Sequence, residues 1–213
     1  MYNFYSTAHK LFVVGGDFSF PYLISNQNIG LGAIYFYDAD NAADVRTNRF
    51  YTDLAMNGNF TDNLSYDVKT IIEVVSKKIA NYSSFSMAYS LDGIQIGAGI
   101  EYASGNNGVL VPFSTVTSRT KVNSFIYPET TGMLLPRIDF SLVGNKFYLD
   151  SNVKANFDFQ TNTPKFSGID VQGSFVYSLF TDLQIGLDVC TYFSAEEDAD
   201  DNFAATLTAA FSF

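Results

Sequence analysis

Hydrophobic and polar residues alternate along most of the chain. In the C-terminal segment 203–213, Phe203, Leu207, Phe211 and Phe213 share one set of alternate positions, and Ala, Thr and Ser occupy the other set. A period of two residues places such side chains on one face of a β-strand. The pattern recurs along the chain and predicts an all-β fold of eleven strands, in residues 12–20, 29–37, 50–60, 66–74, 85–91, 94–102, 138–142, 147–159, 169–179, 183–193 and 203–213.

The connections between these strands are of two kinds. Short ones fall at residues 61–63, 92–93, 144–146 and 181–182, and longer polar ones at 38–48, 76–83, 160–165 and 194–202. The Asp92-Gly93 pair is typical of a two-residue hairpin turn, which needs positive φ angles. Short and long connections alternate, which predicts an antiparallel up-and-down arrangement with short turns at one end and long loops at the other.

Two regions leave the strand count open. Residues 105–133 form either one long loop or an additional strand pair, in 109–117 and 121–127, which would need Pro112 near a strand end. An even count places both termini on the same side of a membrane, so we expect a short first strand within Tyr2–Ala8. The total is then about twelve strands, with ten or fourteen as alternatives.

Composition is compatible with a membrane barrel. The 213 residues form one domain, residues 1–213, by the length prior. Hydrophobic residues make up 47% of the chain, mean hydropathy is +0.06, and no run approaches the ~18 apolar residues of a membrane helix. A barrel hides its apolar residues at alternate positions. The net charge of −10 excludes nucleic acid as an expected partner, because phosphates repel such a surface.

Charged residues in the predicted strands all lie opposite the large apolar side chains. A soluble β-protein also alternates, but a charge that faces lipid at mid-bilayer costs about 2–4 kcal/mol for Lys or Arg, which favours such segregation. A membrane barrel would carry these residues inside. Asp17 is one of them, and we predict that the other thirteen line a pore: Asp53, Asp67, Glu73, Glu101, Asp139, Asp150, Asp158, Asp170, Asp188, Arg49, Lys69, Arg137 and Lys154.

The C-terminal segment that ends in Phe213 resembles the final-strand signal of Gram-negative bacterial outer-membrane β-barrel proteins. The resemblance implies a transmembrane antiparallel β-barrel whose last strand, through Phe203, Leu207, Phe211 and Phe213, is read by the barrel-assembly machinery. It also implies an outer-membrane location, a periplasmic C-terminus, and contact with outer-membrane lipids and lipopolysaccharide. Aromatic residues near the strand ends fit two interfacial girdles. No signal peptide is visible, so we take the sequence as a mature form with an added start Met.

The acidic interior suggests a channel. Ten strand acids against four strand bases leave a net of −6, and rings of Asp and Glu favour cations. We therefore expect passive diffusion of ions or small solutes, with a preference for cations. The simpler interpretation is a polar interior with paired charges, Arg49, Lys69, Arg137 and Lys154 with Asp53, Asp67, Asp139 and Asp158. The alternative function is a structural or adhesion barrel with a sealed lumen, acting through loops 38–48, 105–133 and 194–202.

Catalysis is not expected. Outer-membrane hydrolases of similar size need a His as general base, and His9 is the only one in the chain, with no Ser-containing motif around it. Cys190 has no second Cys or His for a metal or nucleophilic pair. The acidic run 196–201 does not match a calcium loop. We expect no cofactor and no metal. Gly97 and Gly99, inside a predicted strand, indicate close backbone approach or sheet bending.

Overall fold

The computed structural model describes residues 11–24, 26–38, 48–75, 77–105, 132–159, 164–196 and 201–211. These residues form a single all-β sheet of eleven strands, as the alternation predicts. Each predicted strand overlaps one observed strand. The strands are β1 (Leu11–Ile24), β2 (Gln27–Asp38), β3 (Asn48–Asn59), β4 (Leu64–Val75), β5 (Lys78–Leu91), β6 (Ile94–Ala103), β7 (Gly132–Val143), β8 (Phe147–Phe159), β9 (Lys165–Ser178), β10 (Leu183–Ser194) and β11 (Asn202–Phe211).

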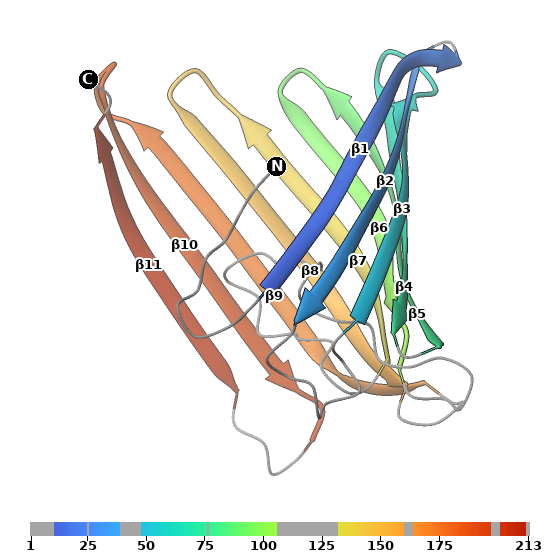
Figure 1. The fold of residues 1–213 in the computed structure, drawn as a ribbon. Coiled ribbons are helices and arrows are strands. Elements are labelled where there is room, and N and C mark those ends of the chain that lie inside the picture. Colours follow the sequence, from blue (N-terminus) through green and yellow to red (C-terminus); the bar gives the residue numbers. More distant parts are fainter. Residues whose placement is uncertain are drawn as a thin grey trace.

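The strands lie in chain order, and each pairs antiparallel with the next (Figure 1). This confirms the up-and-down arrangement. The sheet curls, but within the described residues it is not closed, because β1 and β11 remain its two edges. Successive strands alternate in direction, so these two odd-numbered edge strands run the same way (Figure 1).

Short connections gather at one end of the sheet, which we call the turn end; the opposite end is the loop end. The turn-end connections are residues 25–26, 60–63, 92–93, 144–146 and 179–182. All four predicted short turns are therefore found at one end, together with a fifth that the sequence analysis did not identify. Asp92 and Gly93 have φ angles of 48° and 82°, as expected for the predicted two-residue hairpin.

One predicted loop is wrong. We expected a long connection at residues 76–83, but β5 begins at Lys78, and only residues 76–77 separate it from β4. The first part of β5 was not predicted because it carries polar residues on its apolar side. Asn81 and Ser83 lie on that side and form a hydrogen-bonded chain, in which the Ser83 hydroxyl donates to Asn81 Oδ1 (3.1 Å) and lies 3.1 Å from the Thr70 hydroxyl.

The two uncertain regions have different outcomes. β6 pairs directly with β7, from Ile94 opposite Leu142 to Ala103 opposite Met133. No strand therefore lies between these two in the sheet, although residues 106–131 themselves fall outside the described residues. The short strand expected within Tyr2–Ala8 also falls outside them, so that expectation stays a prediction.

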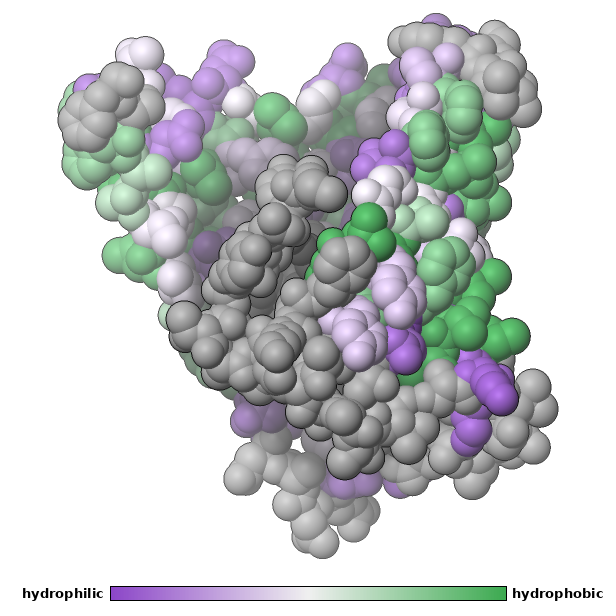
Figure 2. All heavy atoms as spheres, in the orientation of Figure 1, coloured by the Kyte–Doolittle hydropathy of each residue, from purple (hydrophilic) through white to green (hydrophobic). Residues whose placement is uncertain are grey.

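The two faces of the sheet differ in chemistry. On the face that carries Phe18 and Leu207, large apolar side chains are exposed, by 70% and 76% for these two. Tyr192 of β10 packs against Met133 and Leu135 of β7 across two intervening strands, so the opposite face is the concave one. Figure 2 shows apolar residues over the outer side of the molecule and a hollow at the turn end.

The Asp92-Gly93 turn gives a test of the hairpin geometry. A Cβ at Gly93 would lie 2.7 Å from the Val143 carbonyl oxygen, at a φ that L-residues rarely adopt. We expect Gly93→Ala to lower the free energy of unfolding by about 1–2 kcal/mol. The measurement is urea unfolding in detergent micelles. Gly173→Ala is the control, because a Cβ there meets nothing within 4 Å. Equal stability of the two variants would contradict the assigned turn.

Candidate functional site: the concave face

The strand register places all thirteen predicted pore-lining residues on the concave face. One row of directly opposed residues runs from Asp53 through Ile71, Tyr82, Ala103 and Met133 to Asp158. Opposed residues point to the same side of a sheet, and residues two apart along a strand share a face. The same counting places the other eleven here: Asp67, Glu73, Glu101, Asp139, Asp150, Asp170, Asp188, Arg49, Lys69, Arg137 and Lys154.

The loop end of this face is packed with apolar side chains that the sequence analysis did not identify. Tyr51, Ile71, Ala80 and Ala103 form a buried cluster, which we call the loop-end cluster, with Phe36 and Tyr82 packed against it. Met133 and Leu135 form a second buried pair under Tyr192. These apolar residues occupy positions that carry polar side chains elsewhere in the strands. That interruption of the alternation is the sequence signal from which they could have been identified.

An ion pair lies within this packing. Arg49 Nη1 lies 3.3 Å from Glu73 Oε1, and the Tyr51 hydroxyl donates to the same oxygen at 3.1 Å. Glu73 is 1% exposed, so these contacts offset the cost of burying its charge. The expected partner of Arg49 was Asp53. The structure instead pairs Arg49 with Glu73. In the β3–β4 register Glu73 lies opposite Tyr51, one row nearer to Arg49 than the row of Asp53.

A second charged cluster lies at the middle of the face, on β5 to β7. Arg137 forms ion pairs with Glu101 and, through Nε at 3.0 Å, with Asp139. The Tyr82 hydroxyl donates to Glu101 at 3.0 Å. The expected Arg137–Asp139 pair is therefore confirmed, and Glu101 is an additional partner.

Two glycines of β6 make room for this cluster. A Cβ at Gly99 would lie 3.0 Å from Arg137 Nε and 2.9 Å from the Phe85 carbonyl oxygen. A Cβ at Gly97 would lie 3.5 Å from Asp139 Oδ2. The side chains of β7 thus lean across β6 where it carries no side chain. This agrees with the close approach that the sequence suggested for Gly97 and Gly99.

A third set of polar contacts runs across β8 and β9. Asn152 Nδ2 donates to Gln172 Oε1 at 3.3 Å, and Gln172 Nε2 donates to Asp170 Oδ2 at 2.7 Å. Asn152 Oδ1 is buried and accepts no hydrogen bond from any described residue. Lys154 follows on the same face, opposite Asp170, and it is only 8% exposed.

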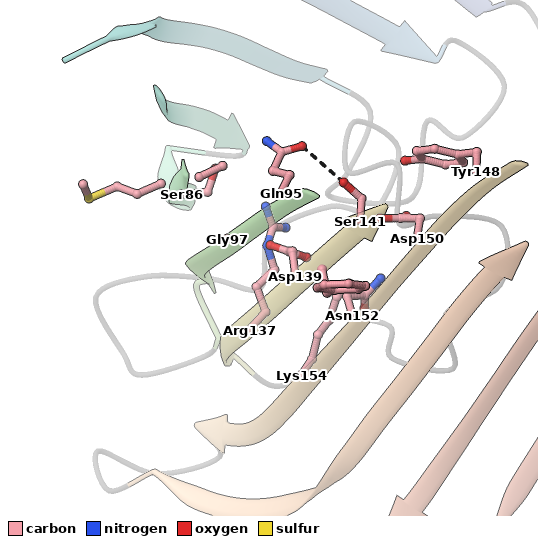
Figure 3. Close-up of a pocket in the computed structure, with 13 residues that line it drawn as sticks. Ser86, Gln95, Gly97, Arg137, Asp139, Ser141, Tyr148, Asp150, Asn152 and Lys154 are labelled. Carbon is pink, nitrogen blue, oxygen red and sulfur yellow. Dashed lines mark hydrogen bonds and ion pairs between the residues drawn. The ribbon is translucent and has the colours of Figure 1, made fainter. Parts of the chain in front are cut away.

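A pocket opens on the concave face toward the turn end (Figure 3). It encloses about 350 Å³. Its lining includes four charged side chains, Arg137 and Asp139 of β7 and Asp150 and Lys154 of β8, with Asn152 between the last two along the strand. Ser141 donates to Gln95 at its rim (3.4 Å). Several predicted pore-lining residues therefore converge on this cavity.

Other acids of this face stand apart from the bases. Among the described residues, Asp53, Asp67 and Asp188 form no ion pair, and neither does Lys69 or Lys154. The expected pairs Lys69–Asp67 and Lys154–Asp158 are therefore not found. Gly32 lies under the Asp53 carboxylate, which occupies the space where a Cβ would be.

The predicted assembly-signal residues lie on the opposite, convex face. Phe203, Leu207 and Phe211 are exposed on β11, and Phe213 falls outside the described residues. Cys190 is a free, buried thiol on the concave face. The candidate base His9 lies outside the described residues.

Within the described ranges, no three His, Cys, Asp or Glu side chains are grouped closely enough to hold a metal ion. Over the same ranges the structure contains no helix that is long and apolar enough to cross a membrane. No family model matches the chain, and no curated protein matches it.

The Arg137 cluster gives a stability prediction. Arg137→Met leaves the Glu101 carboxylate without its main counter-charge on a face where both side chains are largely buried. We expect a loss of about 1–3 kcal/mol in the free energy of unfolding, and a partial recovery when Glu101→Gln is added. Urea unfolding in micelles measures both.

The matched control is the exposed ion pair between Lys165 and Glu196, 3.5 Å apart. Lys165→Met should cost no more than about 0.5 kcal/mol. If Arg137→Met costs no more than this control, or if the two substitutions of the double variant simply add, the cluster does not stabilise the sheet.

Proposed function

We propose that the protein is a transmembrane β-barrel of the bacterial outer membrane that conducts ions or small solutes, with a preference for cations. The observation that carries this proposal is the separation of the two faces. Every charged residue inside a predicted strand lies on the concave face, and the convex face presents large exposed apolar side chains. An apolar outer band around a polar interior is the arrangement that a bilayer demands of a barrel.

Closure of the sheet is part of this proposal. Unpaired strand edges are not tolerated in lipid, because their N–H and C=O groups have no partner there. β1 and β11 run in the same direction, so one strand antiparallel to both would close the sheet with uniform antiparallel pairing. The predicted strand within Tyr2–Ala8 precedes β1 directly and would bring the total to twelve.

The orientation and partners follow from the closing strand of the chain. With the C-terminus in the periplasm, the turn end is periplasmic and the loop end faces outward. Phe203, Leu207 and Phe211 are exposed on the convex side of β11, where assembly machinery and lipid have access to them. Connections at the loop end would then meet lipopolysaccharide.

Cation preference rests on charge. Among the described side chains of the strands, the concave face carries ten acids and six bases, a net of −4, because β5 and β9 add Lys78 and Lys165 to the four bases of the predicted strands. Several of its acids form no ion pair within the described ranges. A wall of this sign lowers the energy of a cation inside and raises that of an anion. Asp53, Asp67 and Asp188 are the acids best placed to act in this way.

A second candidate function is favoured by the loop-end cluster. Tyr51, Ile71, Ala80 and Ala103 are buried on the concave face, and Tyr192 reaches across to Met133 and Leu135. Such packing narrows the interior at the loop end. A barrel sealed there would act as a structural or adhesion protein through its outward loops.

Planar-bilayer recording separates the two candidates. The channel predicts steady conductance and a reversal potential in a KCl gradient that shows preference for K⁺. Combined Asp53→Asn and Asp67→Asn should shift the reversal potential toward that of Cl⁻, because two negative charges leave the wall. Asp62→Asn, in a turn outside the strands, is the control and should change little.

Stable insertion without current would overturn the channel and support the sealed barrel. A preference for anions would overturn the cation-selective mechanism. Should replacement of Tyr51 and Ile71 by Ala produce current where the parent protein has none, the loop-end cluster would be identified as the seal.

A further inference from the structure

We propose that the pocket lined by Arg137, Asp139, Asp150, Asn152 and Lys154 is a binding site for a small zwitterionic solute of the amino-acid type. The site lies on the concave face, toward the turn end (Figure 3). This inference deepens the proposed channel function, and it rests on that function for the route by which a solute would arrive. The binding itself rests on three observations of the pocket wall.

The first observation is a buried lysine that forms no ion pair within the described residues, although Asp170 lies opposite it on β9. This residue, Lys154, is 8% exposed. A buried ammonium group is costly unless an anion or several acceptors accompany it. A carboxylate from a solute in the pocket would supply that anion at the position that Lys154 lines.

The second observation is a buried acceptor without a donor. Asn152 is 4% exposed, its Nδ2 is committed to Gln172, and its Oδ1 accepts nothing from the described part of the chain. An unsatisfied buried acceptor costs about 1–3 kcal/mol. An ammonium group carries three donors and would satisfy it. The two wall groups therefore call for opposite partners: an anion for Lys154 and a cationic donor for Asn152 Oδ1.

The third observation is the order of the charges along the barrel axis. The register gives three successive rows on β7 and β8: Ser141 with Asp150, Asp139 with Asn152, and Arg137 with Lys154. Acids thus occupy the rows nearer the turn end, and bases the row nearer the loop end. The wall has a fixed charge gradient from one end of the pocket to the other.

The spacing of these rows fits one small dipolar molecule. Residues two apart on a strand are separated by roughly 6.6 Å. A solute whose ammonium and carboxylate groups lie a few ångströms apart, each with a hydrogen bond of about 2.9 Å to the wall, spans that distance. The carboxylate would face Lys154, and the ammonium would face Asn152 Oδ1 with Asp139 and Asp150 beside it.

Charge balance and size favour a zwitterion over a simple ion. The lining has two acids and two bases, so it is neutral overall and offers no net gain to a solute with a single charge. Arg137 is already held by Glu101 and Asp139, which leaves Lys154 as the base for the solute. A volume of about 350 Å³ lies at the lower end of ligand pockets.

Isothermal titration calorimetry on the full chain in detergent micelles tests the site with three matched probes. Glutamine carries both charged groups, 4-carbamoylbutanoate lacks the ammonium, and 4-aminobutanamide lacks the carboxylate. We expect glutamine to bind at least tenfold more tightly than either analogue. Equal binding of all three, or no binding of glutamine, would overturn the proposal without any variant.

Two substitutions then locate the site. Lys154→Met and Asn152→Leu should each weaken glutamine binding about tenfold or more, the loss expected for one charge-assisted hydrogen bond. Lys69→Met is the control, because Lys69 lies on the same concave face but outside the pocket lining. A loss with Lys69→Met equal to that with Lys154→Met would show that general lumen charge, not this pocket, holds the solute.

The outcome is independent of conduction. Glutamine binding by a protein that passes no current would support the site and overturn the channel. Current without selective glutamine binding would leave the channel standing and overturn the zwitterion site.

Discussion

The antiparallel register keeps every strand's charged positions on one face of the sheet, and the rest of the structure depends on it. A slip of one residue in any pairing would turn that strand's apolar side chains inward and its acids outward. Ten neighbouring strand pairs hold the register, with irregularities at Pro21–Ile24 and at Asn156–Phe157. The concave face therefore collects charges from strands far apart in the chain, and this is what creates ion-pair clusters and a pocket.

The concave face is divided along its length. At the loop end, apolar packing surrounds the buried Arg49–Glu73 pair. At the middle, the absence of side chains at Gly97 and Gly99 lets the Arg137 and Asp139 side chains lean over β6, where Arg137 forms an ion pair with Glu101 of that strand. Toward the turn end the packing opens into the pocket, where Asn152 Oδ1 has no hydrogen-bond partner and Lys154 forms no ion pair among the described residues. By contrast, Arg49 is paired with Glu73, and Arg137 with Glu101 and Asp139.

Much of this architecture is predictable from sequence, because a period of two residues determines both the strand and its face. The eleven strands and the common face of the charged residues follow from that period, and the antiparallel order follows from the alternation of short and long connections. The start of β5 was missed because Asn81 and Ser83 place polar groups on the apolar side. Their hydrogen bonds to each other and to Thr70 and Ile71 of β4 make that tolerable. A sequence pattern does not contain such cross-strand compensation.

The partners within the site could not be predicted from the alternation either, because they also depend on contacts between strands. Arg49 pairs with Glu73 across strands, although Asp53 is closer in sequence. The loop-end cluster joins Tyr51, Ile71, Ala80 and Ala103 from four strands. Each of these contacts depends on the exact register between strands. The two-residue period does not determine that register, because a shift by two residues keeps every side chain on the same face.

The central claim, that the convex face meets lipid and the concave face meets water, has a direct measurement. Spin labels are placed singly along β10 in a Cys190→Ala background, and their collision rates with oxygen and with a nickel chelate are recorded in lipid bilayers. Positions 185, 187 and 189 should favour oxygen, which concentrates in lipid, and positions 184 and 188 should favour the chelate. Equal accessibility along the strand, or the opposite alternation, would contradict the account.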